Sequence, residues 1–200
     1  MTKIKLCGLV HTEDALAANA AMPDWAGLVF DKGRHFVSDD QAEAIRRTLS
    51  PSIPIAGVFV RDDPEHILRL VRRGVIQVVQ LHGGETEEYL AALKERACCP
   101  FIRVVSVKTR EDVLAAQDTA AEYLLLDHGK GGTGQSFDWS MIPAMEKPWI
   151  MAGGIGLQNL EDALSYDPYG VDISSGAETD GRKDREKMIR LVRMVRDHRK

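Results

Sequence analysis

Met151-Ala-Gly-Gly-Ile155 and Val171-Asp-Ile-Ser-Ser-Gly176 are two stretches in which an apolar run ends in small residues. Small residues let the backbone come close to an anion, and a helix that follows them turns its unpaired N–H groups toward the charge. A single glycine turn of this kind also serves as a plain connection between a strand and a helix. Two of them in succession, at the last two strand ends of a repeating pattern, indicate a site for one phosphate monoester.

The pattern that these stretches complete runs through the whole chain. Short apolar runs alternate with amphipathic segments, and no linker rich in proline, glycine or serine separates them. The runs are almost continuously hydrophobic, as expected of parallel strands covered by helices, and parallel neighbours need long crossovers that are usually helical. The predicted strands are Ile4–Cys7, Gly27–Phe30, Ile55–Val60, Val75–Leu81, Phe101–Val105, Tyr123–Asp127, Trp149–Met151 and Val171–Ser174.

Helix signals fill the gaps between these runs. Thr12 is expected to cap one helix, Asp63-Pro64 begins another with proline in the tolerated first turn, and the final helix is predicted over Lys183–Arg196. Eight strand–helix units in 200 residues predict a compact, single-domain (β/α)8 TIM barrel over residues 1–200. A doubly wound open sheet is the structural alternative.

The composition is that of an ordinary globular protein, with 44% hydrophobic and 28% charged residues. A net charge of -4 argues against nucleic acid as the main partner, because proteins that bind it usually carry a basic excess. The first residues lead directly into a strand pattern, so neither a signal peptide nor a membrane span is expected, and we predict a cytoplasmic protein. Cys7, Cys98 and Cys99 form no disulfide framework, which fits a reducing compartment.

In a (β/α)8 barrel the active site lies at the C-terminal ends of the strands, and phosphate is commonly held by the loops after strands seven and eight. The two glycine stretches fall at those loops. The residues predicted to bind substrate there are Gly153, Gly154, Ser174, Ser175 and Gly176. The other strand ends supply the remaining candidate site residues, namely Cys7, Arg34, His35, Gln80, His82 and Asp127.

Cys7 and Asp127 are the candidates that can transfer protons. Cys7 ends a strand and precedes glycine, so its thiol is expected at the barrel mouth, although most free cysteines are buried small hydrophobes. An ordinary thiol has a pKa near 8.5, and only about 3% of it is thiolate at pH 7 unless the site supplies help. Asp127 follows Tyr-Leu-Leu-Leu, which predicts a desolvated carboxyl with a raised pKa that acts as an acid. The alternative for Asp127 is a plain cap of the following loop.

Neither a metal site nor a nucleotide loop is predicted. His82 and His128 have no further ligand at a suitable spacing. Gly129-Lys-Gly-Gly-Thr-Gly134 lacks the order of glycine, lysine and hydroxyl that holds a nucleotide phosphate. Its four glycines instead predict a mobile loop over the mouth that closes on substrate.

Several stretches share their order and spacing with one enzyme family. They are Lys5-Leu-Cys-Gly-Leu9, Gln80-Leu-His-Gly83, Leu126-Asp127 with the Gly-Gly-Thr-Gly and Phe137-Asp-Trp139 that follow, Ala152-Gly-Gly154, and Val171-Asp-Ile-Ser-Ser-Gly-Ala-Glu178. Together they resemble the phosphoribosylanthranilate isomerases of tryptophan biosynthesis, over nearly the whole chain. The resemblance implies a cofactor-independent (β/α)8 barrel that converts N-(5-phosphoribosyl)anthranilate into 1-(o-carboxyphenylamino)-1-deoxyribulose 5-phosphate.

This Amadori rearrangement needs one acid and one base. The furanose ring opens when its oxygen is protonated, and removal of the C2 proton then gives an enolamine that tautomerises to the ketone. The family assigns the base to the cysteine that matches Cys7 and the acid to the aspartate that matches Asp127.

One loop departs from the family pattern. The family usually carries a motif like Ser-x-Arg-x-Val-Ser after the second strand, with the arginine facing the anthranilate carboxylate, which suits a planar fork of donors. This chain reads Gly33-Arg-His-Phe-Val-Ser38, so His35 stands in the arginine's place and Arg34 one step earlier. We predict that Arg34 binds the carboxylate after a local backbone shift, with His35 beside it.

Two alternatives accompany this prediction. Another phosphosugar enzyme would share the phosphate loops, but the related histidine-pathway isomerase needs an aspartate in place of Cys7, and a pentose-phosphate epimerase needs metal ligands. The other alternative is a non-catalytic phospholigand-binding barrel, against which the presence of both Cys7 and Asp127 argues. The expected partner is a small phosphoribosyl substrate, with neither nucleic acid nor membrane bound, and the chain is expected to be a monomer or a homodimer.

Overall fold

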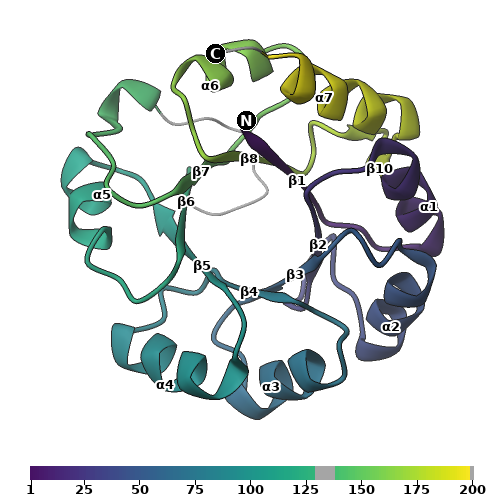
Figure 1. The fold of residues 1–200 in the computed structure, drawn as a ribbon, viewed down its shortest axis with the longest axis horizontal. Helices are drawn as coiled ribbons and strands as arrows, with labels where there is room; N and C mark the ends of the chain where they lie inside the picture. The colour runs from purple at the N-terminus through teal and green to yellow at the C-terminus, as the bar shows by residue number, and fades with distance from the viewer. Residues whose placement is uncertain (129–137, 199–200) are drawn as a thin grey trace.

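Eight parallel strands close into a barrel in which their order around the ring is their order along the chain (Figure 1). They are β1 Lys3–Cys7, β2 Trp25–Val29, β3 Ile55–Phe59, β4 Val78–Leu81, β5 Phe101–Ser106, β6 Tyr123–Asp127, β7 Trp149–Met151 and β8 Gly170–Ile173. The computed structural model describes residues 1–128 and 138–198. Because β1 pairs with both β2 and β8, the predicted TIM barrel is confirmed and the open doubly wound sheet is excluded.

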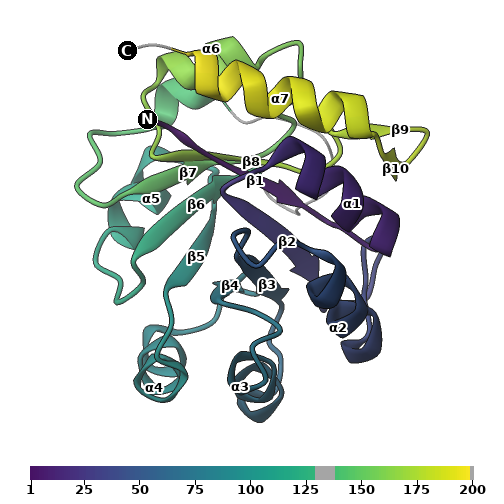
Figure 2. The same cartoon turned by 45° about the vertical axis from the view of Figure 1, so that its right-hand side comes forward.

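Helices surround the ring of strands (Figure 1). They are α1 Thr12–Ala21, α2 Asp39–Thr48, α3 Pro64–Arg72, α4 Glu87–Ala97, α5 Arg110–Ala116, α6 Leu160–Ser165 and α7 Arg185–Asp197. The described part of the connection from β6 to β7 holds only a short 3₁₀ helix, η1 Trp139–Met141, where a regular helix was expected. α7 packs against α1 and so brings the last helix beside the first (Figure 2). None of the helices within residues 1–128 and 138–198 is long and apolar enough to cross a membrane.

The structure moves one or both ends of most predicted strands by one or two residues, begins the last helix at Arg185 rather than Lys183, and adds one element. β4 begins at Val78 rather than Val75, because the residues before it are buried in the turn that leaves α3. Thr12 is the first residue of α1 and not its cap, since His11 holds the N-cap position. A short antiparallel hairpin, β9 Glu178–Thr179 and β10 Arg182–Lys183, follows β8 and was not predicted.

The inside of the barrel is apolar at one end and polar at the other. Alternate residues of each strand point inward, and the inner apolar cluster consists of Ala56, Val78, Ile102, Leu125, Ile150 and Ala152. Trp25, Tyr123 and Tyr169 fill the N-terminal end, with ring centroids 5.2 to 6.2 Å apart. The polar side chains that point inward are therefore concentrated toward the C-terminal ends of the strands.

Candidate active site

A cavity of about 550 Å³ lies at the C-terminal ends of the strands, within the size range of pockets that bind small molecules. It brings together residues that are far apart in the sequence. The predicted site residues that line it are Cys7, Arg34, His35, Gln80, His82, Asp127, Ser174 and Ser175. The predicted residues that do not line it are Gly153, Gly154 and Gly176, which lie in the loops that follow β7 and β8.

Those two loops touch each other through glycine. Gly153 and Gly154 have φ angles of 87° and 64°, a region that favours glycine. Gly156 and Gly176 form an isolated bridge between the loops. A Cβ atom at Gly176 would lie 2.0 Å from the carbonyl oxygen of Ile155, so only glycine lets the loops approach this closely. The two glycine stretches therefore form one continuous edge of the barrel mouth.

Asp127, at the end of β6, is buried and poised to hold a proton. Its Oδ1 accepts a hydrogen bond of 2.7 Å from the backbone N–H of His128, and its Oδ2 lies 3.8 Å from Nε2 of His82. Burial raises the pKa of Asp127, and the hydrogen bond from His128 offsets only part of that effect. Burial lowers the pKa of His82, which favours the neutral ring. The carboxyl group therefore keeps a proton to higher pH than an ordinary aspartate, as its apolar lead-in indicated.

Cys7, at the end of β1, is only 7% exposed and borders the same cavity. Gly27 lies opposite it on β2, and a Cβ atom there would lie 2.7 Å from the Cys7 Sγ. Glycine at that position therefore makes room for the thiol. Burial raises the pKa of Cys7, while the positive charges of Lys5 and Lys183 oppose that rise.

Arg34, His35 and Lys183 converge on the carboxylate of Glu178. His35 Nε2 lies 2.8 Å from Glu178 Oε1, and Lys183 Nζ donates to the same oxygen at 2.7 Å. The Arg34 guanidinium donates to the other oxygen, and 55% of its side chain is exposed. Burial lowers the pKa of His35. With His35 neutral, two cations against one carboxylate leave a net charge of about +1, which suits an anionic group of a substrate.

The sequence and the fold both match one known family. The family model described as N-(5'phosphoribosyl)anthranilate (PRA) isomerase matches residues 4–194. The chain belongs to this family. An N-(5'-phosphoribosyl)anthranilate isomerase of Endomicrobium trichonymphae is 39% identical to it over 201 residues, which cover 98% of this chain and 99% of the relative.

Solved structures of the family have the same barrel. Phosphoribosyl anthranilate isomerase from Thermus thermophilus superposes with a TM-score of 0.87 at 32% identity, covering 99% of this chain and all of the other. A phosphoribosyl anthranilate isomerase in complex with reduced 1-(o-carboxyphenylamino)-1-deoxyribulose 5-phosphate gives a TM-score of 0.81 at 29% identity, covering 98% and 99%. The resemblance inferred from the sequence is confirmed, and the chain is an isomerase of tryptophan biosynthesis.

Sequence reasoning missed charged residues at and around the isomerase cavity. Asp172 lines the cavity. Lys5, Glu178 and Lys183 do not line it but form ion pairs with residues beside it. The sequence did contain a signal for the hairpin that carries Glu178 and Lys183. Asp180-Gly181 is a typical two-residue hairpin turn, and both residues have positive φ angles, of 49° and 79°. The predicted closing loop, Gly129–Gly134, lies outside the described residues.

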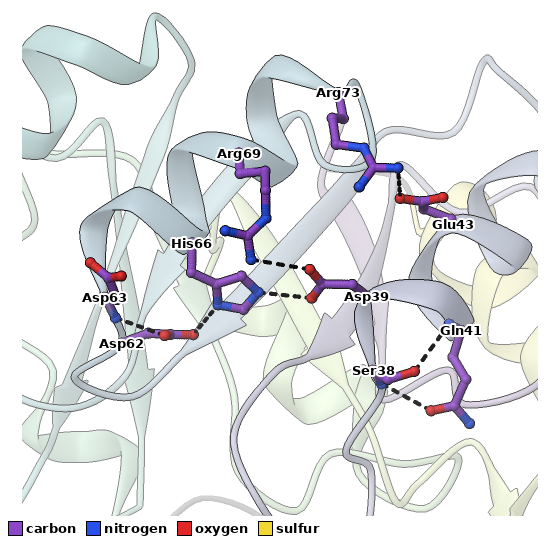
Figure 3. A network of polar contacts seen from close by, with 9 residues as sticks. All are labelled: Ser38, Asp39, Gln41, Glu43, Asp62, Asp63, His66, Arg69 and Arg73. Carbon is purple, nitrogen blue, oxygen red and sulfur yellow. Dashed lines mark hydrogen bonds and ion pairs between the residues drawn. The ribbon is translucent and has the colours of Figure 1, made fainter.

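His66 ties the start of α2 to the loop after β3 (Figure 3). Its Nε2 lies 2.8 Å from Asp39 Oδ1, and its Nδ1 lies 2.8 Å from Asp62 Oδ2. Arg69 adds a contact of 3.3 Å to Asp39. Partial burial lowers the pKa of His66, but the two carboxylates outweigh that effect and raise it. Because α2 directly follows the loop that carries Arg34, this network anchors one wall of the isomerase cavity.

Replacing His66 with glutamine is expected to lower the Tm by about 2–4 °C at pH 5.5, as for a loss of about 1 kcal/mol from a partly exposed ion pair. The folded-state pKa is raised, so the contribution is fully present below the ordinary histidine pKa of about 6.5 and is lost as the pH rises through the raised value. The loss at pH 8.5 should therefore be smaller. Thermal unfolding followed by circular dichroism measures the loss in Tm at each pH, with His198→Gln as the control. An equal loss at both pH values would contradict a charged His66.

Proposed function

We propose that Cys7 and Asp127 are the base and the acid of the isomerisation that this chain catalyses. Asp127 donates its proton to the furanose ring oxygen of N-(5-phosphoribosyl)anthranilate as the bond from that oxygen to C1 breaks. The Cys7 thiolate then takes the proton from C2, and the enolamine tautomerises to 1-(o-carboxyphenylamino)-1-deoxyribulose 5-phosphate. The observation that carries the proposal is that both side chains border one cavity, with the carboxyl desolvated. These two groups supply both proton transfers, so the proposal needs no cofactor.

The walls of the cavity give the substrate a direction. We place its phosphate at the edge formed by the loops after β7 and β8. The hydroxyls of Ser174 and Ser175 are its proposed side-chain donors there. The proposed backbone donors lie around Gly153, Gly154 and Gly176. The anthranilate carboxylate then faces Arg34 and His35, and the ribose lies between Cys7 and Asp127.

Gln80 and His82 complete the proposed ribose site. Gln80 is 2% exposed, and its Oε1 atom has no hydrogen-bond partner among residues 1–128 and 138–198. A buried amide oxygen without a partner is costly. Because Gln80 lines the cavity, a substrate hydroxyl can supply the missing hydrogen bond. His82, beside Asp127, is available to a second hydroxyl.

The proposal is tested by the fluorescence of anthranilate. The labile substrate is generated in situ from anthranilate and phosphoribosyl pyrophosphate, and its disappearance is followed after the purified chain is added. We expect turnover that depends on the concentration of the chain. Binding of the reduced product analogue without turnover would instead favour the non-catalytic phospholigand barrel.

Replacing Arg34 with alanine is expected to raise KM on the order of tenfold, because a charge-assisted hydrogen bond contributes about 1.5–3 kcal/mol and this side chain is half exposed. The change in kcat should be smaller, since the carboxylate is held in the ground state as well as the transition state. Steady-state kinetics measure both constants. Arg193→Ala, on the exposed side of α7, is the control. An unchanged KM in Arg34→Ala with a raised KM in His35→Asn would assign the carboxylate to His35 instead.

The quaternary state and the location of the enzyme stay predictions from the sequence. We expect a monomer or a homodimer that acts in the cytoplasm. Light scattering over a range of micromolar concentrations distinguishes the two assemblies, and a larger assembly would contradict both.

A further inference from the structure

The proposed base faces an electrostatic difficulty. An ordinary thiol is only about 3% ionised at pH 7, and burial raises the pKa of Cys7 further. The residue paired with Cys7 on the neighbouring strand β2 is Gly27, which has no side chain to bind a thiolate. A thiolate at this depth therefore needs a cation beside it.

Among the described residues, Lys5 is the cation whose charge acts most strongly on Cys7. The two residues are two positions apart on β1, so their side chains point to the same side of the sheet, into the barrel. The Lys5 side chain is completely buried, and its Nζ donates a hydrogen bond of 2.9 Å to Asp172 Oδ1 on the neighbouring strand β8. Its ammonium group also interacts with the Cys7 thiol.

Asp172 keeps this lysine charged. Burial alone lowers the pKa of Lys5, but the negative charge of Asp172 and the contact with Cys7 outweigh burial and raise it. The other ionisable groups around Cys7 act in both directions. Lys183 on β10 favours a thiolate and Asp172 disfavours it, whereas His82 and Asp127 line the same cavity across the mouth.

A purely structural role explains this pair poorly. Removing two charges from water is costly, and well-packed apolar residues in their place are often neutral or stabilising. An apolar cluster fills other positions inside this barrel, which shows that the fold can fill such positions without charge. The pair lies directly beneath the side chain whose chemistry requires a cation.

We propose that Lys5, held in place by Asp172, is a positioning residue that stabilises the Cys7 thiolate. The inference rests on the proposed role of Cys7 as the base. Lys5 exchanges no proton with the substrate, because it lies behind Cys7 and does not line the cavity. Its effect on the reaction passes entirely through the fraction of Cys7 that is ionised.

The experiment follows the ionised fraction of Cys7 through the rate at which its thiolate is alkylated. Alkylation of Cys7 by iodoacetamide is followed from pH 6 to 10 by peptide mass spectrometry, which separates Cys7 from Cys98 and Cys99. Lys5→Met replaces the ammonium by an apolar chain of similar length, and Lys5→Met with Asp172→Asn avoids leaving a lone buried carboxylate. Lys3→Met is the matched control, since Lys3 lies on the same strand and also pairs with an aspartate, Asp24 at 3.0 Å, but is 42% exposed.

We expect Lys5→Met to alkylate Cys7 at least tenfold more slowly at pH 7, with the pH profile shifted upward by at least one unit. The double variant should shift in the same direction by a smaller amount, because Asp172→Asn also removes a negative charge that disfavours the thiolate. The kcat of Lys5→Met should fall by a similar factor with KM nearly unchanged, while Lys3→Met matches the wild type. An unchanged alkylation profile in a Lys5 variant that circular dichroism shows to be folded would overturn the inference. That result is distinct from failure of the proposed function, which would appear as full turnover by Cys7→Ala whatever the alkylation profile.

Discussion

Replacing Asp127 with asparagine is expected to lower kcat by about 10²–10⁴-fold, the usual contribution of a general acid. Asparagine keeps the shape of the side chain and can still donate a hydrogen bond, but it has no proton to give to the ring oxygen. The effect should be larger on kcat than on KM, because the proton moves only as the ring opens. Continuous anthranilate fluorescence measures it, with the exposed Asp118→Asn as the control.

The pH dependence gives the Asp127 prediction a second, independent readout. Burial raises the pKa of Asp127, so its active, protonated form is lost as the pH rises through that value. The raised pKa also means that the charged carboxyl destabilises the folded chain at neutral pH, and the free energy of unfolding falls as the pH rises through the folded-state pKa. Asp127→Asn should therefore be at least as stable as the wild type at pH 7. Substantial turnover by this variant would refute the assignment of Asp127 as the acid.

Replacing Cys7 is expected to reduce kcat by about 10²–10⁴-fold as well, because no other group takes over as base. Cys7→Ser is the sharper variant, since serine keeps nearly the volume of cysteine but its hydroxyl does not ionise near neutral pH. Cys7→Ala additionally removes a buried sulfur, at a cost on the order of 1 kcal/mol or about 2–4 °C in Tm. Both should remain folded. Kinetics and thermal unfolding of each variant separate the chemical loss from the loss of packing.

Cys98→Ser is the matched control for Cys7, because Cys98 is exposed where α4 ends. Its turnover should equal that of the wild type. If Cys7→Ser keeps a large part of the wild-type kcat, a different group removes the C2 proton and the proposed mechanism is wrong.

The strands could be read from the sequence because their signals are local. β6 and β7 were predicted at their observed bounds, since both are compact apolar runs with clear breaks on either side. β4 was predicted too long because Val75 and Ile76 are apolar for a different reason, the packing of a turn against the core. Buried residues outside a strand can give the same run of apolar residues in the sequence as a strand does.

The candidate site could be predicted only in part, because its electrostatics depends on long-range pairs. Cys7 and Asp127 could be predicted because each ends a strand, and the C-terminal strand ends of a (β/α)8 barrel form its active site. Lys5 was not singled out, although a lysine inside an apolar strand is unusual. Nothing local shows that its partner is Asp172, or that Arg34 meets Glu178 from 144 residues away.

The Lys5–Asp172 pair has a consequence for the order of synthesis. The two residues are 167 positions apart and join the first strand of the ring to the last. During synthesis Lys5 and Cys7 therefore leave the ribosome well before Asp172, the residue that anchors the lysine. Until β8 emerges, β1 is an open edge of an incomplete sheet. Nascent chains that stop before residue 170 thus carry Cys7 without its electrostatic surroundings, and activity is acquired together with closure of the ring.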